Sequence, residues 1–205
     1  MSARFHHRKA GVLAMLAACA LALPVCAEQP ATDTVAPFNV SARLNFSLTY
    51  PGFLRFRVGT AGGTVDTIGF TVPAATVGSS IPIAGAGGDA GGSSANVQVV
   101  GNNGQVTITA TNSSAGLGIG TGTASDGRIN YNQISTATSS AQLPAPVLTN
   151  AGGTTVQPTL NAPLVTQRTA VWTYAYLNQT IPSAGTYGGA VAARGGRVTY
   201  TATMP

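Results

Sequence analysis

The sequence has almost none of the side chains that most often carry out chemistry. Its only histidines and cysteines, and its only lysine, lie before residue 28: His6, His7, Lys9, Cys19 and Cys26. Residues 28–205 therefore lack the groups that most often act as proton shuttle, nucleophile or soft-metal ligand. This composition predicts a structural or binding protein and not an enzyme.

Carboxylates and metal ligands are equally scarce after residue 27. The acidic residues there are Glu28, Asp33, Asp66, Asp89 and Asp126. Catalysis by paired carboxylates needs two acids in one cleft, and no spacing here indicates such a pair. Zinc and copper sites need His or Cys, and the Gly-rich residues 87–92 carry a single acid where calcium needs several oxygen ligands. The sequence predicts no catalytic residue, no cofactor and no metal.

Charge of either sign is also rare, at 7% of all residues. After residue 27 the chain has seven arginines and five acids, without the clustered basic face that nucleic-acid binding shows. Arg55 and Arg57 have strand spacing, which indicates a solvated strand face. We therefore expect no nucleic-acid partner.

Residues 1–27 have the pattern of a secretory signal peptide. A short basic segment precedes an apolar run at residues 11–23, and small side chains follow Pro24 up to Ala27. The run is shorter than the ~20 residues that span a bilayer, and no comparable run follows, so we expect no transmembrane segment in the mature chain. Lipidation of Cys19 is the alternative, which the apolar continuation at residues 20–23 disfavours. The pattern predicts export to the periplasm and then to the cell surface or beyond.

The rest of the chain has the periodicity of β-strands. Residues 28–37 are polar and indicate a flexible extension, and residues 38–205 are predicted to form one β-sandwich domain. In residues 38–49 apolar and polar side chains alternate without a break, which predicts a strand with one apolar face. Pro51 and Gly52 indicate a turn, and residues 54–58 a second strand.

Later segments continue this pattern. Residues 84–95 are Gly-rich and predict a mobile loop. Residues 97–100 and 105–110 flank an Asn-Gly sequence and predict a β-hairpin. Further strands are expected at residues 128–134, 170–178 and 197–204. Short strands separated by turn residues predict an all-β, antiparallel sandwich.

Three aromatic residues, Trp172, Tyr174 and Tyr176, alternate on one face of a predicted central strand. If that face were exposed, the rings could stack on a sugar; the other interpretation is that they form the core of the sandwich.

Several of these features together resemble chaperone–usher pilus subunits, in particular the spore-coat-U-like branch. They are the signal peptide, the alternating residues 38–48, a late Gly185-Thr186-Tyr187 and the alternating residues 197–204. Unlike many such subunits, this chain has no disulfide near its first strand and does not end in an aromatic-rich strand.

The resemblance implies an immunoglobulin-like sandwich that lacks one strand. A periplasmic chaperone, and then the N-terminal strand of the next subunit, would fill the gap by strand addition. Residues 38–49 would then be a donor strand, or else the first strand of the chain's own domain. The implied donor-strand anchors are Phe38, Val40, Leu44, Phe46 and Leu48. The expected function is a structural fimbrial subunit that self-associates; the alternative is a self-contained adhesin or carbohydrate-binding module with a surface glycan or host ligand.

Overall fold

The computed structural model describes residues 32–123 and 127–205. These residues belong to two units, one that ends at Thr49 and a second, compact unit at Tyr50–Pro205, called the body below. The predicted signal peptide, including Cys19 and Cys26, lies outside the described residues. Residues 32–53 contain no strand, so the strand predicted at residues 38–49 is not formed in this structure.

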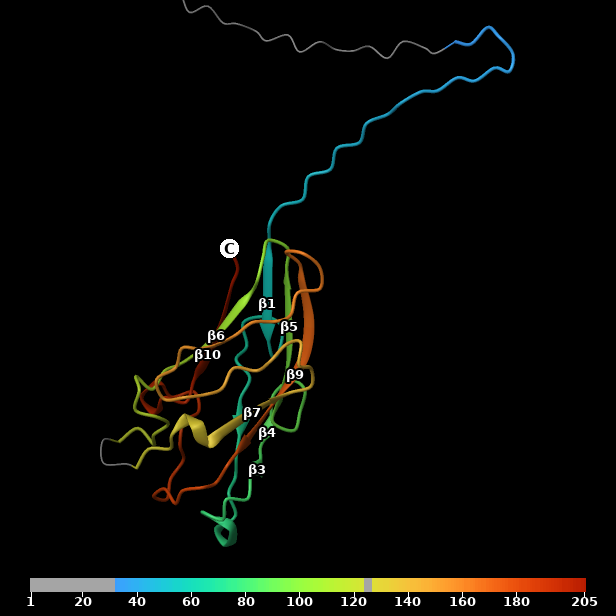
Figure 1. The fold of residues 1–205 in the computed structure, drawn as a ribbon. Coiled ribbons are helices and arrows are strands. Elements are labelled where there is room, and N and C mark those ends of the chain that lie inside the picture. The colour runs from blue at the N-terminus through green and yellow to red at the C-terminus, as the bar shows by residue number, and fades with distance from the viewer. Residues whose placement is uncertain (1–31, 124–126) are drawn as a thin grey trace, which may run out of the picture. The chain divides into compact units, whose positions relative to one another are not determined.

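The body is built from antiparallel sheets (Figure 1). The first sheet has the order β1 (Leu54–Val58), β5 (Ser94–Gly101), β9 (Thr166–Tyr176) and β3 (Ile83–Ala84), and β7 (Ile134–Thr138) also pairs with β9. The second has the order β10 (Val198–Thr203), β6 (Thr107–Asn112) and β8 (Thr154–Val156). A small third sheet joins β2 (Ile68–Gly69) and β4 (Ala86–Gly87), and single 3-10 turns occur at η1 (Ala74–Thr76), η2 (Tyr131–Gln133) and η3 (Ala192–Arg194). The predicted all-β, antiparallel class is confirmed.

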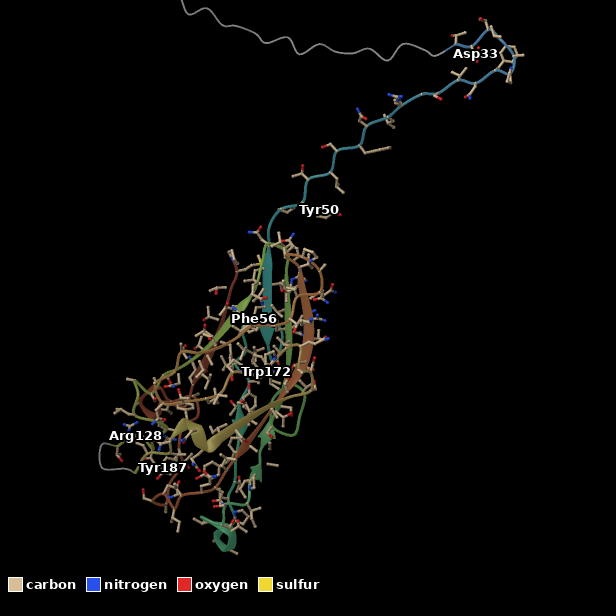
Figure 2. All side chains as sticks on the ribbon, viewed as in Figure 1. Asp33, Tyr50, Phe56, Arg128, Trp172 and Tyr187 are labelled. Atoms are coloured by element: carbon tan, nitrogen blue, oxygen red, sulfur yellow. The ribbon has the colours of Figure 1, made fainter. Side chains whose placement is uncertain are left out.

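Period-two alternation places one face of each long strand in a common core. Val97 and Val99 of β5, Ile108 of β6 and Trp172 of β9 are all buried and belong to one apolar cluster. Figure 2 shows Trp172 inside the body. Since these strands come from both larger sheets, the two sheets pack face to face as a sandwich.

Aromatic side chains join the two sheets across this core. The rings of Trp172 on β9 and Tyr200 on β10 lie 5.2 Å apart between centroids and are inclined by 58°. The hydroxyls of Tyr174 on β9 and Tyr200 are hydrogen-bonded at 2.9 Å. The tilted rings bury apolar area while the paired hydroxyls satisfy each other.

The predicted hairpin at residues 97–110 is wrong. β5 pairs with β1 and β9, whereas β6 pairs with β8 and β10, so the two strands lie in different sheets. Both strands have an apolar face, and across the sandwich those faces bury each other, which side-by-side pairing would not achieve. The Asn-Gly sequence therefore serves a connection between sheets.

Two other segments also differ from the prediction. The Gly-rich residues 84–95 contain β4 and are held by hydrogen bonds, including those from the Asn96 backbone and side chain to the Asp89 carboxylate at 2.7 and 3.0 Å. Residues 128–134 contain the turn η2, and the strand β7 starts only at Ile134. Side-chain hydrogen bonds decide both cases, such as those of Asp89 with Asn96 and of the Tyr131 hydroxyl with the Gly195 carbonyl, and local periodicity does not report them.

We predict that the Tyr174–Tyr200 hydroxyl pair couples the two sheets. Tyr174→Phe or Tyr200→Phe alone leaves the other buried hydroxyl without its partner and should lower the free energy of unfolding by about 1–3 kcal/mol. The double variant should cost less than the sum of the two, because it removes both polar groups. Urea unfolding of all four proteins measures this coupling, and simple additivity would contradict it.

Candidate functional site

The predicted donor-strand anchors are strongly exposed. Relative exposure is 70% for Phe38, 53% for Val40, 74% for Leu44, 90% for Phe46 and 78% for Leu48. Because these side chains alternate with polar ones, an extended conformation gathers them into a single apolar stripe. Exposed apolar surface of this kind indicates an interaction site.

The body has two adjacent strands with unused edges. Within the described ranges, β1 pairs only with β5 and β10 pairs only with β6. The two strands belong to different sheets and contact each other. At one end of the two strands, Gly101 lies close to both. A Cβ added to Gly101 would lie 2.8 Å from the sulfur of Met204, just after β10, and 3.3 Å from Cδ1 of Leu54, on β1. Each strand therefore offers free backbone N–H and C=O groups on the same side of the sandwich.

The core is incompletely covered along these two strands. Inward-facing Val99 and Ile108 on the neighbouring strands have 0% exposure. In contrast, the inward-facing residues of the two edge strands are only half-buried although they pack against the core cluster. We call this surface the β1–β10 seam, and it consists of Leu54, Phe56 and Val58 on β1 and Val198, Tyr200 and Ala202 on β10. Phe56 is labelled on β1 in Figure 2.

The connection between β5 and β6 closes one end of the seam. Asn103 Nδ2 donates to the Pro205 carbonyl at 2.8 Å, next to the end of β10. Asn102 Oδ1 accepts from the Phe53 N–H at 2.8 Å, and Asn102 Nδ2 donates to the Pro51 carbonyl at 2.9 Å, next to the start of β1. Sequence reasoning missed both roles because the Asn-Asn-Gly sequence indicated a hairpin turn.

The predicted turn at Pro51 and Gly52 is wrong. The backbone has no turn at residues 50–53, and Gly52 does not adopt a positive φ. The hydrogen bonds of Asn102 hold this stretch in line with β1, and they outweigh the local turn preference of the Pro-Gly sequence.

Three tyrosines, one of them Tyr200 of the seam itself, form hydrogen bonds at or beside β10. The Tyr131 hydroxyl donates to the Gly195 carbonyl at 2.5 Å, just before β10. Burial raises the pKa of Tyr131 to about 12. Burial also raises the pKa of Tyr200 and of Tyr174, although the hydrogen bond from Tyr200 partly offsets the rise for Tyr174. All three side chains are therefore held in the neutral form.

The aromatic residues predicted as an alternative site lie in the interior. Trp172, Tyr174 and Tyr176 are 0%, 7% and 5% exposed, and the Trp172 indole N–H donates to the Leu143 carbonyl at 3.2 Å. A sugar-stacking platform needs an exposed ring face, so this face of β9 does not provide one.

The described acids are dispersed, and each bonds within its own loop. Asp33 accepts from the Val35 and Asn39 N–H groups, and the Asn39 bond in particular lowers its pKa. Asp66 accepts from Thr60, and Asp89 from Asn96. Among residues 32–123 and 127–205, no three His, Cys, Asp or Glu side chains lie close enough together to hold a metal ion.

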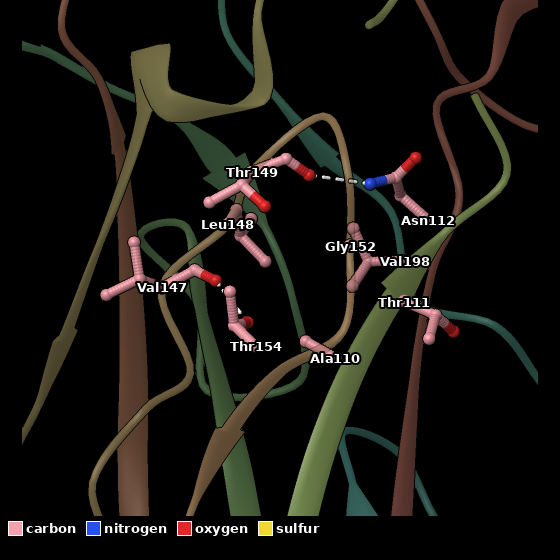
Figure 3. A pocket seen from close by; sticks show the side chains of 9 residues that line it. All are labelled: Ala110, Thr111, Asn112, Val147, Leu148, Thr149, Gly152, Thr154 and Val198. Carbon is pink, nitrogen blue, oxygen red and sulfur yellow. Dashed lines mark hydrogen bonds between the residues drawn. The ribbon is translucent and has the colours of Figure 1, made fainter. Parts of the chain in front are cut away.

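A shallow hollow without room for a water molecule lies beside β6 and β10, where residues 147–154 pack against them (Figure 3). Its polar groups already bond to the protein: Asn112 Nδ2 donates to the Thr149 carbonyl at 2.7 Å, and the Thr154 hydroxyl donates to the Val147 carbonyl. The hollow is therefore a site of internal packing.

No family model matches the chain, and neither does any curated protein or solved structure. In the part of the chain that the structure describes, no helix has the length and apolar character to cross a membrane. The functional argument thus depends on the exposed stripe and the β1–β10 seam.

We predict that alkaline pH destabilises the body through its buried tyrosines. A raised folded-state pKa means that stability is complete below the unfolded value of about 10 and is lost as pH rises toward the folded value. The melting temperature should fall between pH 10 and about 12, where Tyr131 titrates. The melting temperature of the Tyr131→Phe variant should fall less steeply across this pH interval. An identical slope would contradict the assignment of the effect to Tyr131.

Proposed function

We propose that the chain is a structural subunit of a surface fibre, assembled by adding residues 38–48 of one copy to the β1–β10 seam of another. The supporting observation is a pair of complementary features, an exposed apolar stripe with a period of two and a side of the core that two unpaired edges leave half-covered. An added strand would satisfy the free backbone groups of an edge and place alternate side chains over the core.

Burial of apolar side chains would favour such an insertion. Complete burial of a large apolar side chain contributes about 1.5–3 kcal/mol, and five anchors in the stripe are more than half exposed. The donor segment is longer than either β1 or β10, so one segment is long enough to cover the seam. The loss of backbone freedom in the segment opposes binding, and the covered core residues add to the gain.

An immunoglobulin-like sandwich completed by a donor strand belongs to the same proposal, as does a periplasmic chaperone that covers the seam before assembly. Such a chaperone would have to present its own apolar strand to the same edge. The alternative, a self-contained carbohydrate-binding module, would need a surface other than the buried Trp172 face.

The proposal predicts that assembly depends on which face of the donor segment carries a new charge. In the chain at residues 28–205, Phe46→Asp puts a carboxylate on the apolar stripe and should abolish polymers. Asn45→Asp adds the same charge on the polar face and should leave them intact. Light scattering after gel filtration measures polymer size, and a synthetic peptide of residues 38–49 should cap the chains and sharpen the thermal melt of the capped protein.

Limited trypsin digestion gives an independent measurement. Arg43 lies in the middle of the segment without a strand, so the bond after it should be cut quickly in capped monomers and slowly in polymers. A monomer with a sharp melt that neither the peptide nor Phe46→Asp changes would rule out strand addition.

A further inference from the structure

The donor segment is joined directly to an edge of its own acceptor seam. It precedes β1, which is one of the two free edges, and only residues 49–53 separate the two. A fold-back onto β1 would have an effective concentration of about millimolar, whereas copies of the chain meet at much lower concentrations. Assembly between copies therefore requires that this fold-back be disfavoured by the residues at the junction.

A hairpin with a two-residue loop at Pro51–Gly52 would put the stripe on the wrong face. Directly opposed residues of an antiparallel pair share a face. This loop would place Leu48 opposite Arg55 and Phe46 opposite Arg57, on the exposed side of β1. Polar side chains of the segment would then face the core, which is the outcome of a one-residue register slip.

A three-residue loop at residues 51–53 would give the correct face. It would place Leu48 opposite Phe56 and Phe46 opposite Val58, so the stripe would cover the core side of β1. A three-residue loop at residues 50–52 has the same parity, but it would put Pro51 at the second turn position, where proline is disfavoured. The productive short hairpin is therefore the loop at residues 51–53, which requires that Phe53 leave the line of β1 and enter the loop.

Asn102 holds the backbone of Phe53 in line with β1. Its side-chain oxygen accepts from the Phe53 N–H at 2.8 Å, and its own N–H donates to the Phe53 carbonyl at 3.3 Å. Its side-chain amide also donates to the Pro51 carbonyl at 2.9 Å. Both ends of the residue that would have to move are therefore bonded.

We propose that Asn102 prevents self-closure, so that the stripe is available only to another copy of the chain. Register excludes the two-residue hairpin, and Asn102 blocks the three-residue hairpin. This inference rests on the proposed function, and it assigns the regulation of the same seam to a residue that does not touch the donor.

The test compares single and double variants at the junction. Asn102→Ala removes the side-chain bonds to Phe53 and Pro51. Phe53→Gly supplies the residue that a three-residue loop favours at its third, left-handed position, while the backbone groups that bond to Asn102 remain. Asn103→Ala is the matched control, since it alters the same connection but removes only the side-chain bond to the Pro205 carbonyl.

We expect Phe53→Gly and Asn103→Ala to assemble like the unaltered chain. The double variant Asn102→Ala/Phe53→Gly should close on itself, with polymer reduced by at least about tenfold at micromolar concentration. It should melt sharply as a monomer and no longer respond to the peptide of residues 38–49. That sharp melt distinguishes closure from a failure to fold.

A second variant tests the register argument directly. Adding Phe46→Asp to the closed double variant should lower its melting temperature strongly, because residue 46 would now face the chain's own core. Asn45→Asp in the same background should have little effect.

Two negative outcomes have different meanings. If the unaltered chain assembles and the double variant assembles equally well, the role of Asn102 is wrong and strand addition stands. If the unaltered chain neither assembles nor binds the peptide, strand addition fails and this inference fails with it.

Discussion

The connection from β5 to β6 crosses from one sheet to the other, and the rest of the architecture depends on that crossing. Each of these strands has one apolar face, and the two faces bury each other only across a sandwich. Once they lie in opposite sheets, their outer partners β1 and β10 become neighbouring edges. The same connection supplies Asn102 and Asn103, whose side chains bind the start of β1 and the end of the chain.

The half-covered seam and the exposed stripe both leave apolar surface in contact with water. At the seam, apolar side chains of β1 and β10 pack against the core but keep part of their surface in water. In residues 38–48 each of the five anchors is more than half exposed to water. Burial of apolar surface and pairing of backbone groups both favour their association. The proposed fibre would bury the stripe and the seam against each other.

The alternation of side chains along a strand decides which face is apolar, and it also restricts which strand the segment can pair with. Because side chains alternate, the number of residues in the loop decides which face of a segment lies over the core side of the strand that it precedes. A two-residue loop at Pro51 and Gly52 would have the parity that exposes the stripe, and the hydrogen bonds of Asn102 hold the residue that a loop one residue longer would need. The proposed preference for another copy thus depends on local geometry at a few residues.

The amino-acid sequence by itself determined the all-β class, the strand β1, the approximate positions of β9 and β10, and the alternation of the N-terminal segment, because a period of two is a local property. The strand predicted at residues 170–178 runs from Thr166 to Tyr176. It also identified the candidate anchors. Only the tertiary structure decided that β5 and β6 do not pair, that Pro51 and Gly52 form no turn, and that β1 and β10 lie side by side. Periodicity reports which face of a strand is apolar, but the strand's partner is decided by what buries that face and by side-chain hydrogen bonds between residues far apart in the chain.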